Sequence, residues 1–65
     1  MPTITFKDNT TVDVKNDIHT LFRQMNSNDM YVIVMVKSMK LEREGLVEIY
    51  REAIYNKSDI KSIES

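Results

Sequence analysis

The segment from Met30 to Val36 constrains the fold of this chain more than any other feature. Its sequence, Met-Tyr-Val-Ile-Val-Met-Val, is apolar or aromatic throughout and rich in β-branched residues. It is far shorter than the roughly 20 residues of a membrane-spanning helix, and β-branched side chains favour extended backbone. We therefore expect a central strand that runs on to Leu41, with apolar side chains on both of its faces.

Residues 46–55 fit two predictions. As a helix, they gather most of their apolar side chains on one side; as a strand, they alternate, with Arg51 breaking the pattern. Gly45 at the entry, the Val, Ile and Tyr content, and the need of the 30–41 strand for a neighbour favour a strand, paired through a turn at Arg43-Glu44. A helix over residues 44–57 is the alternative.

The first 14 residues predict a β-hairpin around Asp8-Asn9. Ile4 and Phe6 alternate with polar neighbours, and Val12 and Val14 do the same. A two-residue turn would put the two pairs on opposite faces, because the side chains of a strand alternate. All four side chains share one face only if the loop has an odd number of residues, so we expect a loop of three or five.

From Asn16 the apolar period changes to that of a helix. Apolar residues fall at spacings i, i+3, i+4 and i+7, and they are Ile18, Leu21, Phe22 and Met25. Asn16 or Asp17 is placed to cap the start, and Asn26-Ser27-Asn28 to end the helix. Residues 54–64 then predict a strand, a tight turn and a short closing strand.

These elements predict an α+β fold in a single domain, residues 1–65: a small antiparallel sheet of four to five strands with one short amphipathic helix, in the order hairpin, helix, hairpin, short strand. Such a sheet can stay open or curl into a barrel. A chain of 65 residues builds a small core, and it contains no cysteine for disulfides or a Cys-ligated metal. We therefore expect a dimer or higher homo-oligomer.

The charge balance argues against two classes of partner. Nine Lys and Arg stand against ten Asp and Glu, evenly spread, for a net charge of −1. No global field attracts nucleic acid or an anionic membrane. Met1-Pro2-Thr3-Ile4 lacks the basic region and apolar core of a signal peptide. We expect a cytoplasmic protein that does not bind membranes.

Catalytic chemistry has few candidates in this sequence. His19 is the single histidine and lies at the edge of the predicted helical stripe. As a general base it would have no cysteine nucleophile to activate, and as a metal ligand it would have only ordinary carboxylates beside it. Two pairs of glutamates after residue 41 lie among basic residues and are typical of a solvated surface. One glycine cannot build a phosphate-binding loop. We expect no enzyme activity, no metal and no cofactor.

The pairing of residues 30–41 with residues 46–55 leaves apolar side chains on both faces of the second hairpin. One short helix covers one face, so either barrel closure or another molecule must cover the other. We expect an intermolecular contact. Arg51 lies on the face that should be core, where its guanidinium must be paired, reach solvent or line a site. The candidate binding residues are Tyr31, Ile33, Met35, Met39, Tyr50, Arg51 and Ile54.

The function expected from these features is a small non-enzymatic interaction module that binds a protein partner. Ile, Asn and Lys together number eighteen, against three Ala, Gly and Pro, which suggests AT-rich coding and an inhibitor or regulator from a phage or prophage of a low-GC bacterium. One alternative is an oligomer that holds a small nucleotide-like anion at its subunit interfaces, with Arg51, Lys37 and a tyrosine as contacts. A weaker one is a small RNA-binding barrel.

Overall fold

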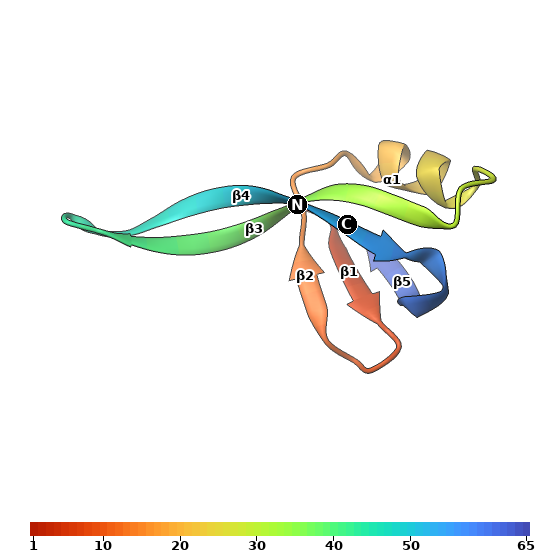
Figure 1. The fold of residues 1–65 in the computed structure, drawn as a ribbon, viewed down its shortest axis with the longest axis horizontal. Helices are drawn as coiled ribbons and strands as arrows, with labels where there is room; N and C mark the ends of the chain where they lie inside the picture. The colour runs from red at the N-terminus through yellow and green to blue at the C-terminus, as the bar shows by residue number, and fades with distance from the viewer.

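The computed structural model describes all 65 residues and has an α+β fold of five strands in two antiparallel sheets with one short helix (Figure 1). One sheet has the order β2-β1-β5 and the other contains β3 and β4, and neither closes into a barrel. No helix has the length and hydropathy that crossing a bilayer requires. The elements are β1 (Thr3–Phe6), β2 (Thr11–Asp13), α1 (Ile18–Met25), β3 (Tyr31–Glu42), β4 (Gly45–Asn56), the 3₁₀ turn η1 (Lys57–Asp59) and β5 (Ile60–Glu64).

The β1–β2 hairpin has the odd loop that its alternation predicts. Phe6 N–H donates to Thr10 O and Asn9 N–H donates to Phe6 O, each at 2.8 Å, so three residues, 7–9, connect the pair. Asn9 has φ of +71°, the left-handed conformation that ends a three-residue loop and that Asn tolerates. The predicted odd loop is therefore confirmed, and it sets Ile4 opposite Val12.

Helix α1 also follows the prediction, with one change in the role of a polar residue. Asp17 caps its start by accepting from the N–H groups of His19 at 3.1 Å and Thr20 at 3.3 Å. Asn16, the other candidate cap, instead accepts from Met35 N–H at 2.7 Å. Leu21 is fully buried, so the apolar stripe packs into the core as its spacing predicts.

The β3–β4 hairpin confirms the strand prediction for residues 46–55 over the helical alternative. Its antiparallel register runs without interruption from Tyr31 opposite Asn56 to Glu42 opposite Gly45. Arg43 and Glu44 make the turn, and Gly45 has φ of +119°, which L side chains rarely adopt.

The prediction that β3 is a central strand is wrong. β3 pairs along its length with β4 alone, and its other edge forms a single bridge, between Val36 and Val14. The apolar run does not need a strand on each side, because backbone and side-chain groups from residues 14–24 satisfy part of that edge. Its apolar side chains instead lie on two faces of the hairpin: one face packs on the core, and the other is exposed to solvent.

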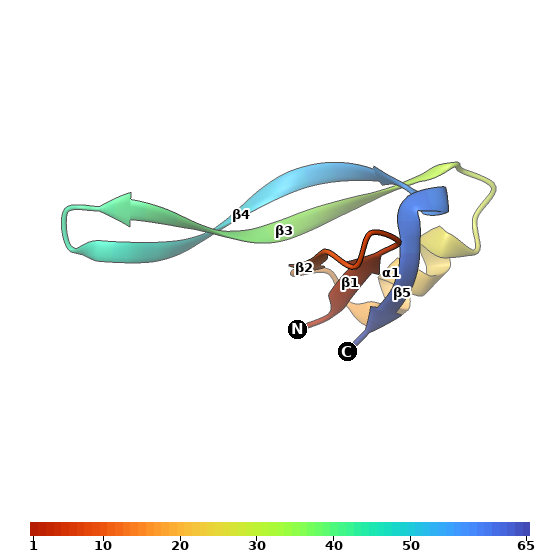
Figure 2. The same cartoon turned by 90° about the horizontal axis from the view of Figure 1, so that it is seen from below.

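The core is small and lies under one face of the β3–β4 hairpin. In Figure 2, α1 and the three-stranded sheet lie on one side of this hairpin, and its other side is bare. The closing strand β5 supplies one core residue and pairs with β1. The six buried residues are Ile4, Val14, Leu21, Val32, Val34 and Ile60.

The distal half of the hairpin projects from the rest of the molecule as an arm, which we define as residues 37–50 (Figures 1 and 2). The molecule measures 43 × 23 × 19 Å. Its radius of gyration is 12.8 Å, whereas a compact chain of this length has about 10.7 Å. Beyond the Val14–Val36 bridge, no backbone hydrogen bond joins the arm to the remainder of the chain.

Candidate functional site

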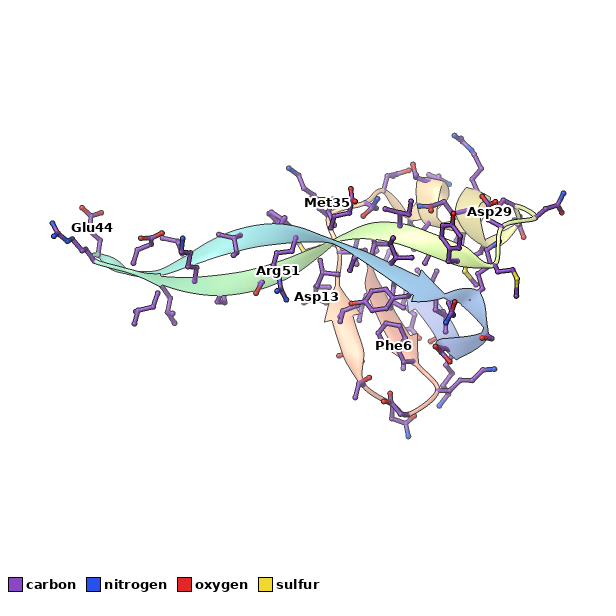
Figure 3. The ribbon with its side chains drawn as sticks, viewed as in Figure 1. Phe6, Asp13, Asp29, Met35, Glu44 and Arg51 are labelled. Atoms are coloured by element: carbon purple, nitrogen blue, oxygen red, sulfur yellow. The ribbon has the colours of Figure 1, made fainter.

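The register divides the hairpin side chains between an inner face, which contains the core residues Val32 and Val34, and an outer face. Of the seven predicted binding residues, six lie on the outer face and only Arg51 lies on the inner one. Figure 3 shows the labelled Met35 and Arg51 side chains leaving the hairpin in opposite directions. The outer-face members are Tyr31, Ile33, Met35, Met39, Tyr50 and Ile54.

The outer face is an uncovered apolar surface. Near the body, Ile33 is 41% exposed and its cross-strand neighbour Ile54 is 61% exposed. On the arm, Leu41 is 76% exposed and its neighbour Leu46 is 67% exposed. Two paired apolar positions at each end, open to solvent, form a surface of the kind that soluble proteins use for contacts with other proteins.

A polar cluster in the middle separates these two apolar patches. The Lys37 ammonium lies 3.7 Å from a Glu48 carboxylate oxygen, and the Tyr50 hydroxyl donates to Glu48 at 2.6 Å. The Lys15 ammonium lies 5.2 Å from the centre of the Tyr50 ring. The hydrogen bond to Glu48 raises the pKa of Tyr50, because ionisation would remove the donated proton and place two anions together. Tyr50 is thus held in place on this face.

Arg51 reaches solvent, one of the outcomes its position in the strand allows. It lies opposite Val36 on the inner face, exposed, and forms no ion pair within 4 Å. Lys37, its companion in the predicted anion site, lies on the outer face. Within one chain the two cations therefore point away from each other and do not converge on one ligand.

The two edges of the hairpin differ in how they are closed. Near the body, the Gln24 amide donates to Ile33 O at 3.0 Å and accepts from Ile33 N–H at 2.9 Å. Lys15 N–H donates to Met35 O at 2.8 Å, beside the bond that Asn16 accepts. Nothing comparable reaches β4. These edge contacts were not predicted: the sequence offers Asn16 as a helix cap, and nothing in it assigns Gln24 to a strand edge.

The structure also places a shallow hollow beside the first hairpin loop, which the sequence did not indicate. Its volume is about 520 Å³, and the Phe6 and Tyr55 rings, with centroids 4.8 Å apart, form one wall. Asp8 at its rim accepts from the Thr10 hydroxyl at 2.6 Å and from Thr10 N–H at 3.0 Å. These bonds lower the pKa of Asp8, the hydroxyl bond most, because they favour the carboxylate.

The remaining sequence candidates lie apart from these surfaces. His19 is exposed in the first turn of α1. No group of three or more His, Asp and Glu side chains is arranged to hold a metal ion. Comparison with known proteins finds no match: no family model fits the chain, and no curated protein or solved structure is similar to it.

Proposed function

We propose that this protein is a non-enzymatic interaction module that associates with itself and binds a protein partner through the outer face of the β3–β4 hairpin. The observation that supports this is the pair of apolar patches, Ile33 with Ile54 and Leu41 with Leu46, which nothing in the chain covers. Exposed apolar side chains at paired strand positions offer a partner a dense contact area.

The composition of the outer face favours a protein as the partner. Met35, Met39, Tyr31 and Tyr50 are residue types that adapt to or anchor protein contacts. Lys37 on this face is matched by Glu48, and the chain carries a net charge of −1, so a polyanion finds no basic surface here. In this proposal the protein acts in the cytoplasm as an inhibitor or regulator, phage- or prophage-encoded, by occupying a surface of its partner.

The anion-binding alternative has less support. It needs Lys37 and Arg51 on one ligand, and they project from opposite faces of the hairpin. An oligomer would have to bring the two residues together from different chains. The apolar patches would then still lack a role.

The test is a single charge on the outer face. Ile54→Lys places an ammonium in the proximal patch, where the exposed side chain contributes little to folding. Thr11→Lys adds the same charge at an exposed position of the other sheet and serves as the control. The protein captured by wild type from cells that encode this chain is identified, purified and titrated with all three proteins by calorimetry.

We expect Ile54→Lys to weaken binding at least tenfold and Thr11→Lys to leave it within a factor of two, because an unpaired ammonium buried in an apolar contact is costly. Equal affinities for wild type and Ile54→Lys would place the partner elsewhere and reject the outer face.

A further inference from the structure

The outer edge of β4 is open along its entire length. In an antiparallel ladder, alternate residues direct their N–H and C=O groups toward the neighbouring strand. Lys57 N–H donates to Met30 O at 2.9 Å, which continues the register and makes the odd-numbered residues of β4 those that bond β3. The even-numbered residues from Leu46 to Ile54 therefore direct their backbone groups away from β3, and no hydrogen bond reaches them.

Such an edge is a template for another strand. Proteins usually shorten, cover or bend an open edge, because unpaired backbone groups recruit other chains. β4 has twelve residues, a regular register with no bulge, and no covering element. β3, in contrast, has its edge closed near the body by Gln24, Asn16 and Lys15.

We propose that β4 pairs antiparallel with β4 of a second copy about a two-fold axis at Ile49, forming a four-stranded sheet of order β3-β4-β4-β3. This pairing rests on the self-association proposed above and specifies its surface. A two-fold axis perpendicular to the sheet keeps the two outer faces on the same side. The partner of the outer face and the second copy on the edge therefore occupy different surfaces.

The exposed surface area of the chain is consistent with a second copy bound at this edge. The chain exposes 4919 Å², whereas a compact monomer of 7.6 kDa exposes about 4,300 Å². The excess is about 600 Å² per chain, or about 1,200 Å² for two, which is the lower end of stable protein interfaces. Burying the arm and the β4 edge against a second copy would return each chain to the surface expected of its mass.

Among the axes at the middle of β4, residues 48–52, charge selects one register. An axis at Tyr50 would place Glu48 opposite the partner's Glu52, and an axis at Arg51 would place two guanidinium groups together. An axis at Glu48 or Glu52 would pair that glutamate with its own copy. Like charges directly opposite each other destabilise a sheet.

An axis at Ile49 avoids every such pair within β4. Ile49 then meets the partner's Ile49, Val47 meets the partner's Arg51, and Glu48 meets the partner's Tyr50. The hydrocarbon stem of Arg51 covers the valine while its guanidinium stays in solvent, which gives a use to the cation that has no ion pair in one chain. The tyrosine hydroxyl has one proton, so in the dimer it would donate to the facing carboxylate in place of Glu48 of its own chain.

The register makes a disulfide test possible in a chain without cysteine. Odd-numbered residues of β4 would form the non-hydrogen-bonded pairs, whose Cα atoms lie about 4.5 Å apart, within disulfide range. Ile49→Cys should therefore link to its copy under mild oxidation. Val47→Cys and Arg51→Cys are matched controls on the same strand and face, since each residue and its copy would be offset by four positions, about 13 Å.

We expect Ile49→Cys to form a covalent dimer at least tenfold faster than either control alone, and an equimolar mixture of Val47→Cys and Arg51→Cys to link at about half the rate of Ile49→Cys, because about half of its dimers combine the two variants. Faster linkage of Arg51→Cys alone would reject this register. Native hydrogen exchange on the unmodified protein gives a second readout. The amides of Glu48 and Tyr50 should be protected in the dimer, and fast exchange at both would reject edge pairing.

Sedimentation of the wild-type protein separates this proposal from the proposed function. A 7.6 kDa monomer at 100 µM would overturn the pairing, and the effect of Ile54→Lys on partner binding would still decide the role of the outer face. Conversely, linkage through Ile49→Cys with equal partner affinities for wild type and Ile54→Lys would support the dimer and reject the outer face as the partner site.

Discussion

Asp8 shows how one side chain fixes local geometry in the body of the molecule. It accepts two hydrogen bonds from Thr10, and together with the left-handed Asn9 it sets the three-residue loop that aligns β1 with β2. The odd loop was predictable because the alternating apolar side chains of the two strands must lie on the same face of the hairpin. The hydrogen bonds of Asp8 were not, since many polar residues of a loop could serve equally from sequence alone.

Acid should weaken this loop. The pKa of Asp8 is lower in the folded than in the unfolded chain, so its contribution to stability is present above the unfolded value, about 4, and is lost as pH falls through the folded value. We expect NMR titration of Thr10→Val to show the Asp8 midpoint moving up toward that of an ordinary carboxyl. Thr10→Ser keeps the hydroxyl and should keep the low midpoint. An unchanged midpoint in Thr10→Val would mean that Thr10 does not set it.

At the scale of elements, α1 contacts the β3–β4 sheet in two ways: it packs into the core, and it hydrogen-bonds the edge of β3. Leu21 packs beneath the hairpin, while Gln24 bonds both backbone groups of Ile33, as a neighbouring strand would. The strands and the helix were predictable from their periods. The contact between Gln24 and Ile33 was not, because it depends on where two elements meet in space and no pattern within either element encodes that meeting.

Gln24→Met should lower the free energy of unfolding by about 1–2 kcal/mol, because two exposed hydrogen bonds are lost and water replaces them in part. Gln24→Glu keeps an acceptor for Ile33 N–H but places a carboxylate oxygen against Ile33 O, where the two acceptors repel, so its loss should be at least as large. Urea denaturation measures both. Equal stability of wild type and Gln24→Met would show that the helix is held by Leu21 and its neighbours alone.

For the whole molecule, the main fact is that a small body carries a long arm. Six residues are buried, and the distal half of the longest hairpin extends beyond them. The sequence predicted an apolar hairpin face that the helix does not cover. It did not predict two separate sheets or the projecting arm. The alternation in residues 37–50 defines two faces of a hairpin, but it does not show whether another element of the chain packs against either face.

A molecule of this shape should gain stability from its own concentration. Folding coupled to dimerisation, with an unfolding enthalpy of about 45 kcal/mol per chain, raises the Tm by about 5 °C for each tenfold increase in concentration. Calorimetry from 5 to 500 µM measures this slope. Ile49→Asp, which would face its own copy across the axis, should abolish it. A Tm of the wild type that is independent of concentration would contradict self-association.

The separation of the arm from the core also bears on how such a protein can change over evolutionary time. All six buried residues lie outside residues 37–50, so the arm and the core share no position at which a substitution must satisfy both. Variation in the arm can alter its exposed surface while leaving the core of the body intact. Substitutions on the arm can therefore accumulate without disturbing the packing of the buried residues, so the arm can diverge faster than the body.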